Sequence, residues 1–246
     1  MERIDCKKEF LKVFNSLCYS RSAWQVWSDF ITASACSIAN AVDKGKHFEE
    51  REKEYTQCIE CLGGEEKAAQ LFSFIVMALE ENPNQDFLGS LYMELNLGSH
   101  WKGQFFTPYC LCELLSKMTI GETAEAIKKK GWTVVNDPSC GAGATLIAAA
   151  NIIKEKGINY QRNVLFVAQD IDRITGLMCY IQLSLLGCAG YVVIADTLSN
   201  PIVGKSALFI EEKEGQEVWY MPMFCSEVWE SRRTWNYIDA VANCQI

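Results

Sequence analysis

Long apolar runs are missing from this sequence of 246 residues. No stretch reaches the roughly 18 uninterrupted apolar residues of a membrane span. The first ten residues, MERIDCKKEF, have no apolar run after their charges, as a secretion signal would. These absences argue against a membrane protein and a secreted one, and we expect a soluble protein of the cytoplasm.

Positive charge is also scarce. The sequence has 23 lysines and arginines against 31 aspartates and glutamates, which gives a formal net charge of -8. Cationic side chains supply most of the binding to nucleic-acid phosphates, so this balance disfavours unassisted binding to DNA. A role on DNA therefore requires a local basic patch or a partner subunit.

Patterns that bind metals are poorly represented. The sequence has only two histidines, and among its twelve cysteines only Cys58 and Cys61 form a CxxC pair. One pair without a second is weak evidence for zinc, and we predict no metal site. Several other cysteines lie inside apolar patterns, which favours buried free thiols over disulfides.

The first hundred residues have the spacing of helices. Apolar residues recur at helical intervals within residues 6–40 and again within residues 67–81. The charged stretch 48–60 forms another expected helix, and a further one begins at Asp86. We therefore predict an all-helical N-terminal bundle over residues 1–100.

Beyond residue 130, short apolar runs alternate with helical segments. The expected strands and helices are, in chain order, TVVNDPS, ATLIAAANIIKEKG, NVLFVAQDI, RITGLMCYIQLSLLG and GYVVIADTL. Strands and helices that alternate in this way predict right-handed βαβ units and a parallel sheet covered by helices. Residues 101–246 are therefore expected to form a domain of the α/β class.

Aspartates stand at the ends of all three expected strands. Asp137, Asp170 and Asp196 should meet at the sheet edge where such folds bind ligands. Gly141 and Gly143 let the backbone approach a ligand, and the helix that follows directs free amides toward it. Amides for a carboxylate, an acid for a ribose and an acceptor for an adenine amine together fit S-adenosylmethionine (SAM). Taken singly, each residue also suits a tight turn or a helix cap, and only their order favours a cofactor.

The segment GQFFTP, residues 103–108, is not explained by helix initiation alone. A cap at Thr107 and a proline at position 108 would account for two of its residues but not for the other four. Together, GQFFTP, DPSCGAG, QDID and ADTL make the sequence similar to the N6-adenine DNA methyltransferases. Within that family it most resembles the modification subunits of type I restriction systems and their phage- and element-borne relatives.

The resemblance implies a Rossmann-like, SAM-dependent methyltransferase core that follows a helical bundle. It also implies a set of cofactor-binding residues: Phe106, Thr107, Pro108, Asp137, Pro138, Cys140, Gly141, Gly143, Asp170, Asp196 and Thr197. In this scheme the Asp137–Gly143 turn wraps the methionine moiety, Asp170 holds the ribose, and Asp196 with Thr197 meets the adenine. Asp172 is expected to cap the next helix.

The catalytic motif of that family, [ND]PP[YF], is missing. In the motif, an Asn or Asp side chain and a proline carbonyl accept hydrogen bonds from the adenine amino group, and the aromatic ring stacks on the flipped-out base. Asn200-Pro201 comes too soon after the third strand, and the segment with Pro222 and Phe224 has Met221 where the acid or amide belongs. Pro222 and Phe224 are the catalytic candidates that remain.

The region after the third strand is short for a complete methyltransferase sheet, so we expect a truncated parallel sheet. ALFIEEKEGQEVWYMP is read as a hairpin, and CSEVWESRRTWNYIDAV as a closing helix on which Arg232 and Arg233 form a solvated face. An incomplete sheet leaves an edge that must be covered or paired. That edge favours a homodimer or a hetero-oligomer.

Three hypotheses for function follow. The first is a SAM-binding N6-adenine DNA methyltransferase-like protein that is weak or inactive alone because the base-activating motif is missing. The second is an active N6-adenine DNA methyltransferase with an unorthodox motif or a partner subunit, which would also supply contact with DNA. The third is a helical interaction protein whose pocket is a relic.

Overall fold

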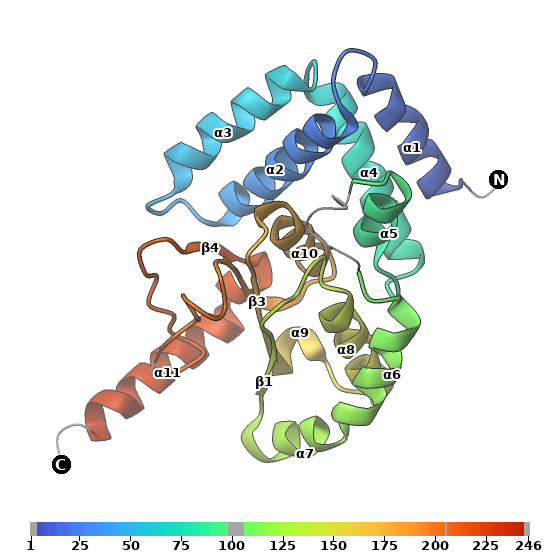
Figure 1. Cartoon of the computed structure of the whole chain (residues 1–246). Helices are drawn as coiled ribbons and strands as arrows, with labels where there is room; N and C mark the ends of the chain where they lie inside the picture. Colours follow the sequence, from blue (N-terminus) through green and yellow to red (C-terminus); the bar gives the residue numbers. More distant parts are fainter. Residues whose placement is uncertain (1–3, 98–105, 205, 244–246) are drawn as a thin grey trace.

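The N-terminal region of the protein is helical. The computed structural model describes residues 4–97, 106–204 and 206–243 (Figure 1). The helices of this region are α1 (Cys6–Leu17), α2 (Ala23–Val42), α3 (Phe48–Cys61), α4 (Glu65–Glu81) and α5 (Phe87–Glu94). The predicted helices are confirmed. The predicted boundary at residue 100 lies outside the described residues, as do residues 103–105 of GQFFTP.

Polar caps set where these helices begin. The Asp5 carboxylate accepts a hydrogen bond from the Lys8 amide at the start of α1, and Ser22 forms a reciprocal capping box with Gln25 at the start of α2. Asp86 caps α5 by accepting from the Gly89 amide at 2.8 Å. Each cap satisfies an amide that the helix itself leaves unpaired.

A four-stranded sheet forms the rest of the core. Its strands are β1 (Thr133–Asp137), β2 (Val164–Asp170), β3 (Ala189–Ile194) and β4 (Glu217–Tyr220), in the spatial order β1-β2-β3-β4. The first three strands are parallel, and β4 runs antiparallel to β3. The segments that join the parallel strands hold α8 (Ala144–Glu155), α9 (Tyr160–Asn163) and α10 (Arg173–Leu185). The three predicted parallel strands are confirmed.

The hairpin predicted over residues 207–222 is wrong. Only Glu217–Tyr220 of that stretch is a strand, and it pairs with β3. An isolated bridge joins Ser206 to Phe209. The physical reason is that β3 offers a buried edge with which Glu217–Tyr220 can pair. The Gln216 side chain donates to the carbonyls of Asn200 and Pro201 and so holds the preceding segment as a loop.

The helix that follows GQFFTP also starts differently from expectation. In α6 (Tyr109–Thr119), Pro108 occupies the N-cap position and no side chain caps the helix. The prediction that Thr107 caps it is therefore wrong, because the chain enters the helix one residue later than expected. After α6, the chain continues through α7 (Gly121–Lys130) into β1.

Buried side chains form one large cluster on the α8 and α10 face of the sheet. This cluster includes Phe166 of β2 and Tyr180 of α10, and it extends to Phe10 and Trp27 of the N-terminal helices. Helix α2 packs directly against α10 (Figure 1). The helical region is thus fastened to the sheet by a shared core, which brings α5 close to the carboxyl ends of the strands.

The other face of the sheet is covered by η1 (Pro222–Cys225) and α11 (Glu227–Asn243). Trp229 of α11 is fully buried there against Phe224 and Trp132. Arg233 donates to the Phe224 carbonyl at 2.8 Å, and Arg232 donates to the Arg162 carbonyl. These two half-buried arginines therefore hold α11 on the sheet, a role that the predicted solvated face did not include. No described helix is both long and apolar enough to cross a membrane.

Candidate functional site

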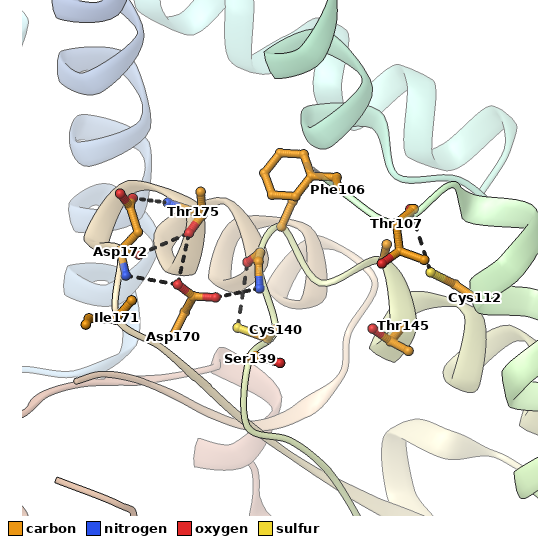
Figure 2. Close-up of a pocket in the computed structure, with 13 residues that line it drawn as sticks. Phe106, Thr107, Cys112, Ser139, Cys140, Thr145, Asp170, Ile171, Asp172 and Thr175 are labelled. Carbon is orange, nitrogen blue, oxygen red and sulfur yellow. Dashed lines mark hydrogen bonds between the residues drawn. The ribbon is translucent and has the colours of Figure 1, made fainter. Parts of the chain in front are cut away.

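A cavity of about 550 Å³ lies at the carboxyl ends of β1 and β2 (Figure 2). The beginnings of α8 and α10 bound it, and residues 106 and 107 before α6 form a further wall. Five of the residues predicted from sequence line it: Phe106, Thr107, Cys140, Gly141 and Asp170. The fold thus brings the GQFFTP segment, the glycine turn and the second strand end into one cavity.

Asp170 organises this cavity. Its Oδ2 accepts a hydrogen bond from the Gly141 amide at 2.8 Å. Its Oδ1 accepts from the Asp172 amide at 2.9 Å and from the Thr175 hydroxyl at 3.3 Å (Figure 2). An ionised carboxylate can accept about four hydrogen bonds, so these three leave about one for a ligand. Asp170 therefore joins the turn after β1 to the start of α10 and retains capacity to accept from a hydroxyl.

The turn between β1 and α8 needs its glycines. Gly141 and Gly143 have φ values of 51° and 94°, which other residues rarely adopt. A Cβ on Gly141 would lie 3.1 Å from Cε1 of Phe106, and a Cβ on Gly143 would lie 2.8 Å from Sγ of Cys179. Side chains here would therefore fill the cradle between the turn, α10 and Phe106. Gly143 is the N-cap of α8 and does not line the cavity.

An aromatic pair covers the turn. The Phe106 ring lies above Gly141, and its centroid is 5.3 Å from that of Tyr92 on α5. Tyr92 is buried, so the position of Phe106 depends on how α5 packs. Pro108, which was predicted to share this wall, is exposed and does not line the cavity. The N-terminal helices thus contribute to the site through Tyr92.

Two thiols lie beneath the turn. Contact with Cys179 and burial raise the pKa of the Cys140 thiol well above its usual value. Hydrogen bonding to Cys140 lowers the pKa of Cys179, but burial together with the nearby carboxylates of Asp137 and Asp170 raises it overall. Both thiols are therefore neutral at pH 7, and thiolate chemistry is not favoured. Their role is to pack α10 against the glycine turn.

Asp137 acts inside the turn. It accepts from the Thr145 hydroxyl at 2.7 Å and from the Ser139 amide at 3.1 Å. Thr145 and Ser139 line the cavity, whereas Asp137 itself does not. The carboxylate at the first strand end therefore fixes the residues that face the cavity.

The third strand end lies outside the cavity. Asp196 accepts from the Leu198 amide at 2.9 Å and from the Ser199 hydroxyl at 2.8 Å. These bonds, the Leu198 amide first, lower the pKa of the Asp196 carboxyl. Thr197 donates to the Pro138 carbonyl at 2.5 Å. These residues join the third strand end to the turn after β1 without lining the cavity.

The two catalytic candidates also lie elsewhere. Phe224 is only 5% exposed and stacks on Tyr220, with Tyr191 and Trp229 around it. Its ring is enclosed by these neighbours and is not free to stack on a base. Pro222 opens the short helix η1 beside it. The structure therefore places Phe224 in the core on the α11 side of the sheet, with the half-buried Pro222 beside it.

Sequence reasoning missed several lining residues. Thr145, Thr175, Cys112, Ser139 and Ile171 all line the cavity. Thr175 could have been found, because it lies one helical turn after the Asp172 cap and so beside Asp170. Cys112 lies on the buried face of α6, which packs on α8, and no local pattern indicates that contact.

Comparisons with known proteins identify a family for this chain. Residues 84–239 match the family described as N-6 DNA Methylase. The chain is 32% identical over 136 residues to the methylase subunit of the type I restriction enzyme MpnII from Mycoplasma pneumoniae. That match covers 54% of this chain and 23% of the relative, so the chain corresponds to less than a quarter of it. No solved structure matches the chain.

Proposed function

The chain belongs to the N-6 DNA methylase family, and we propose that it binds SAM in the cavity at the carboxyl ends of β1 and β2, within a Rossmann-like fold. The observation that carries the proposal is the bond from the Gly141 amide to Asp170, which brings the glycine turn and the strand-end acid to one ligand. The cavity of about 550 Å³ lies within the usual range for small-molecule sites.

The lining residues fit the parts of this cofactor. The remaining acceptor capacity of Asp170 suits a ribose hydroxyl, and the first amides of α8, at Ala144 and Thr145, suit a carboxylate. Gly141 lets the Phe106 ring pack directly on the turn, so that the ring and the turn form adjoining walls of the cavity. The adenine contacts of Asp196 and Thr197 remain a prediction, since neither residue lines the cavity.

We further propose that the chain alone transfers no methyl group to DNA. When bound, SAM supplies an electrophilic methyl group, and the protein must make the adenine amine a better nucleophile. None of the five prolines is adjacent to another, so the sequence contains no [ND]PP[YF] motif. The formal charge of -8 adds no general attraction for DNA. The chain is then a SAM-binding subunit of the cytoplasm that lacks the motif that activates the adenine amine.

An active enzyme formed with a partner chain is the second candidate. Among the described strands β1 pairs only with β2, so its outer edge is open, and Val134 on this strand is 38% exposed. An open edge beside the cavity favours pairing with another segment. Such a segment would stand where it can contribute a base-activating residue. The relative from Mycoplasma pneumoniae is itself one subunit of a restriction enzyme.

Two measurements test these proposals together. Calorimetric titration with SAM should show saturable binding to the purified chain. Transfer of tritium from labelled SAM to adenine-containing duplex or single-stranded DNA should be absent with the chain alone. Absence of binding would refute the cofactor site, and transfer by the chain alone would refute the proposed inactivity. Transfer that appears only with a partner subunit would favour the second candidate.

Replacement of Gly141 by alanine should weaken SAM binding about tenfold or more. The added Cβ would stand 3.1 Å from Cε1 of Phe106 and would displace this ring, which lines the cavity, and φ at 51° adds about 1 to 2 kcal/mol of strain. Gly131→Ala is the matched control, because Gly131 has φ of 79° and no atom near its Cβ position. The control should lose similar stability and keep its affinity in calorimetry. Equal affinities of Gly141→Ala and wild type would contradict the placement of the ligand.

A further inference from the structure

A buried glutamine on α10 connects the N-terminal helices to the glycine turn. The Nε2 of Gln182 donates to the Ala142 carbonyl at 2.9 Å and to Oδ1 of Asp86 at 2.8 Å. Its Oε1 accepts from the Leu88 amide at 3.0 Å. Gln182 is 0% exposed, so its two N–H groups and its carbonyl oxygen are all used inside the protein.

Gln182 belongs to one face of α10 that supports the turn. Thr175 donates to Asp170, Cys179 lies against Gly143, and Gln182 holds the Ala142 carbonyl. Their spacing of four and three residues places all three on the same side of the helix. Thr175 and Cys179 act within the α/β part of the chain. Of these three residues, Gln182 also reaches the helical region, at the start of α5.

Helix α5 in turn sets the aromatic cover of the cavity. Asp86 caps α5, and Tyr92 on this helix packs against Phe106 with ring centroids 5.3 Å apart. Phe106 lies directly above Gly141. The position of α5 relative to the turn therefore fixes the height of the Phe106 ring above the cavity floor.

We infer that Gln182 is a positioning residue for the cofactor site, which holds α5 and the Cys140–Gly143 turn in register so that Phe106 and the turn form adjoining walls against one ligand. The inference rests on the proposed binding of SAM. Gln182 does not line the cavity, so it acts through Ala142 and through the chain from Asp86 to Phe106.

The first test is Gln182→Met, which keeps the length of the side chain and removes all three hydrogen bonds. The affinity for SAM should fall about tenfold or more in calorimetry, because the Ala142 carbonyl and the Leu88 amide lose their partners. The matched control is Gln216→Met. Gln216 is also a buried glutamine that bonds to backbone groups, but it lies before β4 and away from the cavity. It should lose stability without losing affinity.

The second test measures how the affinity for SAM depends on pH. A purely structural role of Gln182 would not make this affinity depend on pH. Gln182→Glu places a carboxylate at hydrogen-bond distance from Asp86, whose own pKa is raised by burial. At pH 8 the two acids repel, and near pH 6 they can share a proton that restores one donor. The ratio of variant to wild-type dissociation constants should therefore fall severalfold from pH 8 to pH 6.

Other titratable side chains near residues 86 and 182 would not cause this pH dependence. Burial raises the pKa of Tyr109 and of Cys112 on α6, and the pKa values of Cys140 and Cys179 are raised as well. All four groups stay neutral between pH 6 and pH 8. If Gln182→Met fails to fold, the pH series of Gln182→Glu alone decides the question.

Hydrogen exchange separates this inference from the proposed function. In the protein without ligand, amides of residues 140–146 should exchange severalfold faster in Gln182→Met than in Gln216→Met. If wild type binds no SAM, the proposed function fails, and faster exchange at the turn would still support the positioning role. Wild-type affinity in Gln182→Met, an equal loss in Gln216→Met, or exchange at the turn that equals the control would overturn the inference.

Discussion

Replacing Asp170 with alanine is expected to lower the affinity for SAM by at least about a hundredfold. The variant lacks the carboxylate that is proposed to bond to the ligand. It also removes the shared acceptor of the Gly141 amide, the Asp172 amide and the Thr175 hydroxyl. A hydrogen bond to a charged group contributes about 1.5 to 3 kcal/mol, so loss of the one to the ligand, together with release of the Gly141 turn, suffices. Calorimetric titration of wild type and variant measures the effect directly.

The matched control for that experiment is Asp5→Ala. Asp5 also accepts a backbone amide at a helix start, but it lies at α1, in the N-terminal bundle. Loss of this cap should cost about 1 kcal/mol of folding stability and leave SAM affinity unchanged. If Asp170→Ala binds SAM as tightly as Asp5→Ala, the carboxylate does not hold the cofactor. SAM would then be held by other groups, whereas absence of binding in the wild type would favour the relic pocket of the helical interaction protein.

The strands and the glycine turn could be predicted from sequence because local chemistry determines them. The apolar runs that became β2 and β3 are buried on both faces, as in parallel sheets, and so read as continuous hydrophobic segments. Gly141 and Gly143 stand where φ is positive, which few other residues tolerate. The sequence also indicated that Asp172 would cap α10, and it does.

The rest of the site depends on contacts between distant parts of the chain. Gln182 meets Asp86 and Ala142 across 96 and 40 residues, and nothing in its own neighbourhood indicates either partner. Tyr92 reaches Phe106 through the packing of α5. A reading of local patterns therefore finds the strand ends and misses the side chains that hold them in place.

The hairpin was predicted wrongly for a different reason. Gly215 indicates a turn, but the two segments that flank a turn need not pair with each other. The upstream flank buries Leu208 in the core as a loop, whereas Glu217–Tyr220 met an available strand at β3. The sheet edge decided the pairing. This edge also carries Phe224 into the core, so the catalytic candidate lost its exposure for the same reason.

Replacing Gly190 with alanine is expected to destabilise the fold by about 3 kcal/mol or more. Gly190 lies in β3 opposite Phe166 of β2, and a Cβ there would stand 1.8 Å from the Phe166 carbonyl oxygen. That atom belongs to the backbone of a central strand, so no side-chain rotation can relieve the clash. The two strands must separate, and Asp170 at the end of β2 would move with them. Urea unfolding followed by circular dichroism measures the loss.

Gly157→Ala is the control that separates the steric clash at Gly190 from the backbone strain of a positive φ. Gly157 has φ of 75° after α8, and no atom lies near its Cβ position, so the change should cost about 1 to 2 kcal/mol. If Gly190→Ala costs no more than this control, β2 and β3 can part without loss of the fold. Close approach of the two strands would then not be what holds Asp170 beside the Gly141 amide. A larger loss in Gly190→Ala, together with weaker SAM binding by the folded fraction, would tie the geometry of the cavity to the spacing of the sheet.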